Sequence, residues 1–145
     1  MIIRNCAGGV VFNEDKVFIL KNDKSEWVLP KGKIRDELPT ETAISRVEYE
    51  TGVDARIVSS AGETAYEFYS ITRNQSVCNK IIWYIMESYD QKYSINTREG
   101  FKNGGFYSIE EAIDMITYNQ DKSLVSLSYK RYLEFKDYKQ KLSYA

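Results

Sequence analysis

Apolar residues in the first two thirds of the chain fall into runs that predict β-strands. Residues 2–12 and 17–20 flank a polar turn, which predicts a hairpin. Residues 55–70 are β-prone, and Gly62 within them indicates a bend. Residues 77–86 are apolar on both faces, which is typical of a central strand. Shorter strands are expected at 27–29 and 106–107.

A helix is predicted between these strands, at residues 39–51. Pro39 suits the first helical turn, and Gly52 is placed where a left-handed residue ends a helix. Ala43 and Val47 recur between them at helical spacing and predict a buried face. Pro30 and Gly32, before the helix, indicate a loop.

Two more helices are expected near the C-terminus. Ser108 and Glu111 form a capping box that opens the first helix. The second is predicted from about residue 122 to 138, and we expect residues 139–145 to fray. Its apolar side is formed by Val125, Tyr129, Tyr132 and Leu133.

Composition and net charge limit the classes of function that the chain can have. The 145 residues are expected to form one domain, residues 1–145, and the formal net charge of −1 predicts neither a nucleic-acid nor a membrane partner. The sequence has no histidine, which argues against zinc sites and histidine-based catalysis. Cys6 and Cys78 lie in apolar runs, so we expect buried free thiols and a cytoplasmic protein. A homo-oligomer is compatible with the sequence.

Charged residues concentrate around the predicted 39–51 helix. The preceding loop carries Lys31, Lys33 and Arg35, and the helix carries Arg46 and Glu50. Cations hold phosphates, and carboxylates hold the divalent metal that bridges them. This pattern is typical of a polyphosphate site.

Residues 27–53, WVLPKGKIRDELPTETAISRVEYETGV, resemble the Nudix box. The opening LPKGK and the later NKIIWYIM are similar to the diadenosine polyphosphate and diphosphoinositol polyphosphate branch of the Nudix (MutT-like) family. The resemblance implies an α/β sandwich: a mixed central sheet with the box helix on one side and the C-terminal helices on the other. It also implies a nucleotide or polyphosphate ligand, with Mg²⁺ or Mn²⁺ as cofactor if the protein is an active hydrolase and none otherwise.

The box can be aligned in two ways. Aligning on Gly32 keeps Arg46 as the box arginine but misplaces the closing glycine. Aligning on Gly52 keeps Glu37 and Glu50 and requires one deletion in the loop. A deletion in a loop costs little, whereas a shift within a helix turns every face by about 100°. We therefore favour the Gly52 alignment.

In that alignment the box is degenerate. Ser45 replaces the box arginine, Arg46 replaces the next glutamate, and Tyr49 replaces the first member of the Glu-Glu pair. The resemblance then assigns Glu50 to metal and catalysis, with Glu37 in support. It assigns the substrate to Lys31, Gly32, Lys33, Arg46, Lys80 and Tyr84.

Two functions follow from this box. One is a slow Nudix-type hydrolase that cleaves a phosphoanhydride of a nucleoside diphosphate derivative or dinucleoside polyphosphate. The other is a module that kept the fold, lost catalysis and binds a nucleotide or polyphosphate. Arg46, four residues from Glu50, is expected either to bind phosphate together with Lys31 and Lys33 across one cleft or to form a plain surface pair.

Overall fold

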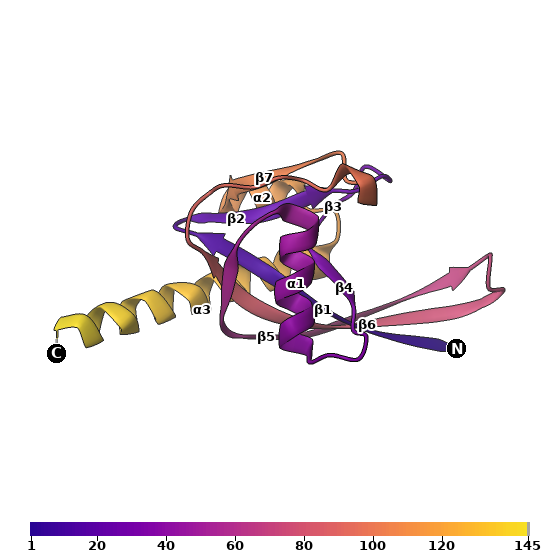
Figure 1. The fold of residues 1–145 in the computed structure, drawn as a ribbon, viewed down its shortest axis with the longest axis horizontal. Helices are drawn as coiled ribbons and strands as arrows, with labels where there is room; N and C mark the ends of the chain where they lie inside the picture. Colours follow the sequence, from indigo (N-terminus) through magenta and orange to yellow (C-terminus); the bar gives the residue numbers. More distant parts are fainter. Residues whose placement is uncertain (145) are drawn as a thin grey trace.

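The computed structural model describes residues 1–144 and shows one mixed sheet with helices on both faces (Figure 1). The predicted α/β class is confirmed. The elements are β1 (Ile2–Asn13), β2 (Lys16–Lys21), β3 (Trp27–Val28), β4 (Lys31–Lys33), α1 (Pro39–Thr51), β5 (Ala55–Ser70), β6 (Gln75–Ser88), η1 (Thr97–Glu99), β7 (Asn103–Ser108), α2 (Ile109–Met115) and α3 (Asn119–Tyr144).

Strand β1 organises the sheet. The main path runs β3-β2-β1-β6-β5, with β4 joined to β1 and β7 joined to β2. The β1–β6 pair is parallel and the other strand pairs are antiparallel. Strand β6 lies between β1 and β5, which confirms the predicted central strand.

Two hydrophobic clusters hold the layers together. Val11 and Met86 of the sheet pack with Val47 of α1 on one face. Phe12 and Trp83 belong to the other cluster, which includes residues of α2 and α3. The predicted sandwich is therefore confirmed, with the box helix and the C-terminal helices on opposite faces.

Helix α1 begins and ends where the sequence predicts. Pro39 is its first residue, and Gly52 ends it in the left-handed region at φ 70°. The Gly52 N–H donates to the Glu48 carbonyl at 2.8 Å, which satisfies one of the last carbonyls of the helix. Ala43 and Val47 are fully buried, as the Gly52 alignment expects.

The long β5–β6 hairpin projects beyond the body of the molecule (Figure 1). A register irregularity falls between Ser60 and Gly62, and Gly62 has a φ of 95°, so the predicted bend is a β-bulge. Tyr66, Phe68 and Tyr69 are exposed on the projecting part.

Two expectations need correction. Lys31–Lys33 form strand β4 because they pair with β1, so this segment is not a free loop. Helix α3 starts earlier than predicted and continues through residues expected to fray, aided by a Lys141–Asp137 ion pair at 3.2 Å. Leu133, on the apolar side of α3, is 46% exposed. Ala145 lies outside the described residues.

Cys6 and Cys78 are both buried free thiols, as predicted. Within residues 1–144, no helix has the length and apolar character needed to cross a membrane.

Candidate phosphate-binding site

Strand β4 brings the glycine of the predicted box against helix α1. Gly32 pairs with Ala7 of β1, and the flanking residues Lys31 and Lys33 pair with Gly8 and Cys6. A Cβ atom on Gly32 would lie 2.2 Å from Nε and 2.5 Å from Cδ of Arg46. Only glycine therefore allows the arginine to lie against this strand.

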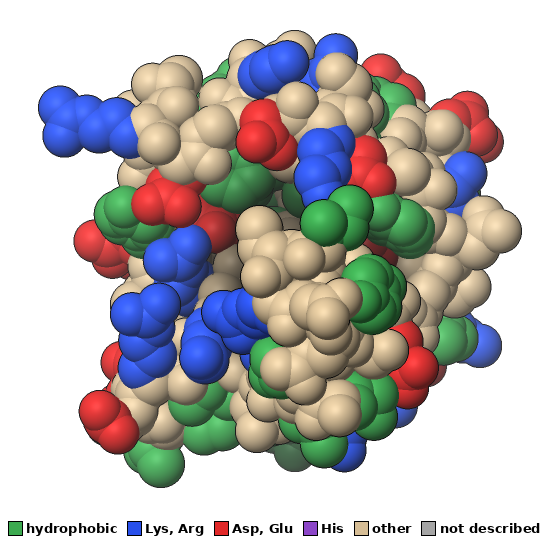
Figure 2. Space-filling model, turned by 90° about the vertical axis from the view of Figure 1, so that its right-hand side faces the viewer, with side chains coloured by type: hydrophobic (Ala, Val, Ile, Leu, Met, Phe, Trp, Pro, Cys, Tyr) green, Lys and Arg blue, Asp and Glu red, His purple; other side chains and the backbone are tan. Residues whose placement is uncertain are grey.

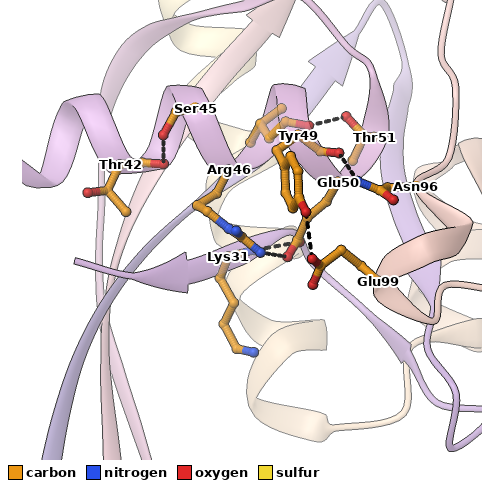
Figure 3. Close-up of polar contacts among 10 residues, drawn as sticks. Lys31, Thr42, Ser45, Arg46, Tyr49, Glu50, Thr51, Asn96 and Glu99 are labelled. Atoms are coloured by element: carbon orange, nitrogen blue, oxygen red, sulfur yellow. Dashed lines mark hydrogen bonds and ion pairs between the residues drawn. The ribbon is translucent and has the colours of Figure 1, made fainter. Parts of the chain in front are cut away.

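Arg46 is held by two neighbours on its own helix (Figure 3). Its Nη2 donates to Oε2 of Glu50 at 2.6 Å. Its guanidinium carbon lies 4.8 Å from the centre of the Tyr49 ring, a cation–π distance. The predicted proximity of Arg46 and Glu50 is confirmed.

In the Gly52 alignment, Glu50 is the one box carboxylate on α1, and it is 5% exposed. The Lys31 backbone N–H donates to its Oε1 at 3.3 Å. Burial raises the pKa of the Glu50 carboxyl above its usual value, and the Arg46 guanidinium offsets only part of this effect. A buried acid that is already bonded to a cation is a poor place for a second cation.

The structure also brings Glu99, the last residue of η1, to this site. The Tyr49 hydroxyl donates to Glu99 Oε1 at 2.6 Å. The loop is fixed to the end of α1 because the Asn96 N–H donates to the Glu50 carbonyl at 3.0 Å. Nothing local in the sequence signals this contact between residues 49 and 99.

The two lysines and Arg46 lie on different faces of strand β4. Residues of a strand alternate between faces, so Lys31 and Lys33 leave β4 on the face opposite the Gly32–Arg46 contact. Figure 3 shows the Lys31 side chain directed away from the Arg46–Glu50 pair. Arg46 and the two lysines therefore leave β4 and α1 on different faces of β4, and their binding of one ligand stays a prediction.

The lysines instead belong to a basic group that straddles β4 and β1. We define the basic group as Arg4, Lys31, Lys33 and Arg46. Lys33 pairs with Cys6, Lys31 pairs with Gly8, Arg4 is two residues before Cys6 on β1, and Arg46 lies against Gly32 between the two lysines. Burial raises the pKa of the Cys6 thiol, and all four cations counteract that effect. Figure 2 shows Lys and Arg side chains gathered beside a hollow on the side toward which the hairpin points. The sequence analysis did not select Arg4, because only the pairing of β1 with β4 brings it into the basic group.

The remaining predicted site residues are not part of the basic group. Glu37 is exposed and accepts a hydrogen bond from the Thr42 hydroxyl at 2.8 Å, which places it at the start of α1. Lys80 is exposed on β6 and pairs with Asn5. Tyr84 is half-buried against the cluster beneath α1, a packing role.

The NUDIX domain family model matches residues 3–127 of the chain. The chain belongs to the Nudix family. The resemblance drawn from residues 27–53 is thereby confirmed.

Solved Nudix structures share the fold. An Ap4A hydrolase from C. elegans is 16% identical and has a TM-score of 0.67, with 90% of this chain and 98% of that chain covered. The E. coli dihydroneopterin triphosphate pyrophosphohydrolase is 12% identical, with a TM-score of 0.68 and coverage of 86% and 95%. A MutT protein from Methanosarcina mazei Go1 is 17% identical, with a TM-score of 0.69 and coverage of 90% and 96%. At these identities, the similarity shows the fold alone.

Nudix proteins generally use a divalent metal, but the residues of this site do not fit one. Residues 1–144 contain no group of three or more Cys, Asp or Glu side chains arranged to hold a metal ion. Glu50 is bonded to Arg46, and Glu99 accepts a hydrogen bond from Tyr49. The position that would attract a metal holds a guanidinium.

Proposed function

We propose that this Nudix protein binds the phosphate chain of a nucleotide or dinucleoside polyphosphate. The observation that carries the proposal is the basic group of Arg4, Lys31, Lys33 and Arg46, set beside the buried acid Glu50. Arginine and lysine bind phosphate oxygens through charge-assisted hydrogen bonds. The names of the similar Ap4A and dihydroneopterin triphosphate enzymes identify the ligands to test first.

Binding is tested by calorimetry of the full chain with ATP, Ap4A and dihydroneopterin triphosphate. Lys31→Gln combined with Lys33→Gln removes two phosphate ligands, and a loss of about 1.4 kcal/mol or more, tenfold in affinity, is expected. Lys130→Gln combined with Lys139→Gln is the matched control, because both lysines are exposed on α3. Equal affinity in the wild type and the Lys31/Lys33 variant would contradict the proposal.

A second candidate function is slow hydrolysis of the same ligand, and Glu99 is the observation that favours it. Its carboxylate accepts from Tyr49 beside Arg46, at the end of the box helix. In this reaction a water oxygen bonds to phosphorus, the phosphoanhydride P–O bond breaks, and Glu99 accepts the proton of the water. Because Glu50 is engaged by Arg46, we expect turnover to be slow.

Hydrolysis is tested by measuring product release from ATP, Ap4A and dihydroneopterin triphosphate. A general base contributes about 10²–10⁴-fold, so Glu99→Gln should lower the rate by that order. Glu110→Gln, an exposed acid on α2, is the control. Turnover that survives both Glu99→Gln and Glu50→Gln unchanged would place the chemistry elsewhere.

A further inference from the structure

We propose that Arg46 is a resident cation that binds the ligand's phosphates in place of a divalent metal. This inference rests on the proposed function and specifies its chemistry: phosphate binding that needs no Mg²⁺. The resemblance to the Nudix family predicts a metal cofactor, and this inference replaces that metal with an arginine.

Three groups surround the Arg46 side chain and fix its position. Glu50 accepts its Nη2 hydrogen bond at 2.6 Å, and the Tyr49 ring lies 4.8 Å from the guanidinium carbon. The third side is the backbone of Gly32, where a Cβ atom would overlap the arginine at 2.2 Å. The Tyr49 ring is itself held, because its hydroxyl donates to Glu99.

The Arg46–Glu50 pair differs from an ordinary ion pair on a helix surface. Lys141 and Asp137 are also four residues apart, yet their side chains are 75% and 64% exposed and their atoms are 3.2 Å apart. In the Arg46–Glu50 pair the side chain of the acid is 7% exposed and that of the arginine is 29% exposed. Truncating a partly buried pair leaves an uncompensated acid, whereas an exposed helix pair contributes only about 0.3–0.5 kcal/mol.

The guanidinium retains donors for a ligand. Arginine has five N–H donors in a planar fork, and one nitrogen is committed to Glu50. The buried Nε has no hydrogen-bond partner among the described residues, and the side chain stays partly open to solvent. The remaining Nη donors suit two oxygens of one phosphate group, which an arginine binds with two parallel hydrogen bonds.

A divalent metal cannot share this position. An ion that bound Glu50 would lie within a few ångströms of the guanidinium charge, and like charges at that distance repel. It would have to displace Arg46 from Glu50, Tyr49 and Gly32 together. The two cations are therefore alternatives, and the fold supplies the arginine.

The test is calorimetry with inorganic tripolyphosphate as the probe, in EDTA and in Mg²⁺, using the full chain. The wild type should bind in EDTA at least as tightly as with Mg²⁺. Arg46→Gln should weaken binding in EDTA by about tenfold or more, equivalent to about 1.4 kcal/mol. Arg46→Lys keeps the charge but loses the fork, so its affinity should fall between the two.

Arg56→Gln is the matched control, because Arg56 pairs with Glu87 on the β5–β6 ladder and should leave the affinity unchanged. Thermal unfolding of each variant establishes that it is folded, and Arg46→Lys carries the test if Arg46→Gln is not. Binding that appears only with Mg²⁺, or that Arg46→Gln does not weaken, overturns the inference and leaves phosphate binding in place. Absence of binding by tripolyphosphate and by all three named ligands under both conditions overturns the proposed function itself.

Discussion

Two arginine–glutamate pairs in this molecule have nearly equal geometry and different surroundings. Arg46 and Glu50 are 2.6 Å apart on α1, and Arg56 and Glu87 are 2.8 Å apart across the β5–β6 ladder. Each pair lies next to a tyrosine side chain. The contrast between them compares a pair that links the sheet to a helix with a pair that, in our proposal, meets a ligand.

Glu87 is fully satisfied. It accepts hydrogen bonds from Arg56 and from the Tyr132 hydroxyl of α3. Burial raises the pKa of Glu87, but these two donors outweigh it and leave the pKa below its usual value. This pair joins the sheet to the last helix.

Glu50 has the opposite balance. Burial dominates and leaves the pKa of its carboxyl above the usual value in spite of Arg46. The tyrosine beside it stacks on the arginine and directs its hydroxyl to Glu99 instead. Both oxygens of Glu50 accept a hydrogen bond, from the Lys31 N–H and from Arg46, so deeper burial is what distinguishes Glu50 from Glu87: 7% of its side chain is exposed, against 22%. A carboxyl whose pKa is raised by burial beside a charged partner is typical of functional positions.

The largest effect is expected from Arg46→Glu combined with Tyr49→Glu. With Glu50 these place three carboxylates at positions 46, 49 and 50 on one helix face, a set that suits Mg²⁺. Hydrolysis of ATP and Ap4A in Mg²⁺ should rise by about 10²-fold or more, measured by product release. Mg²⁺ should also raise the melting temperature of this variant.

Arg56→Glu is the control for that gain, because it places the same acid beside Glu87. A folded Arg46/Tyr49 double variant with neither Mg²⁺ stabilisation nor added turnover would show that the lost acids are not what distinguishes this box.

Gly32→Ala should displace Arg46 without changing any charge. The new Cβ would overlap Nε and Cδ of the arginine, so the Arg46 side chain must move away from Gly32. Tripolyphosphate binding in EDTA should weaken by about 0.7–1.4 kcal/mol, about 3–10-fold, by calorimetry. In an Arg46→Gln background the same change should have no further effect, and additive losses would show that Gly32 acts independently of Arg46.

The two tyrosine hydroxyls should differ in their contribution to stability. Tyr132 is 1% exposed, so Tyr132→Phe should lower the free energy of unfolding by about 1 kcal/mol through the lost bond to Glu87. Tyr49 is 48% exposed, and Tyr49→Phe should cost less than about 0.5 kcal/mol. Urea unfolding measures both, and an equal cost would remove the distinction between the pairs.

The smallest effect is a pH dependence at Glu87. The folded-state pKa of Glu87 lies below the ordinary value of 4.5. The Glu87 carboxylate therefore contributes to the free energy of unfolding above pH 4.5, and this contribution is lost as the pH falls through the folded-state pKa. Glu87→Gln should therefore lower the unfolding free energy at pH 7 and differ less from the wild type in acid. Glu110→Gln is the exposed control, and a Glu87→Gln deficit that grows in acid would contradict the sign.

The fold was largely predictable because local signals coincide with it. Pro39, Gly52 and the buried pair Ala43 and Val47 define α1 within a few residues of sequence. The apolar run of 77–86 marks β6 as central. What failed depends on distant partners: Lys31–Lys33 become a strand only because Cys6–Gly8 pair with them.

The candidate site was predictable only in part for the same reason. The Arg46–Glu50 contact follows from helical spacing within α1. The face on which Lys31 and Lys33 project depends on the register of β4 against β1, and the Tyr49–Glu99 contact joins residues 50 positions apart. The extension of α3 to Tyr144 depends on helix-forming charged residues with little apolar patterning, which the prediction treated as a frayed tail.

Direct titration of the wild-type protein with Mn²⁺, followed by electron paramagnetic resonance of the free ion, tests the central claim. If Arg46 occupies the place of the metal, Mn²⁺ added without ligand should stay free up to roughly equimolar and higher concentrations. Arg46→Glu combined with Tyr49→Glu should remove one equivalent of free Mn²⁺ under the same conditions. A stoichiometric Mn²⁺ site in the wild type that Glu50→Gln abolishes would contradict the account.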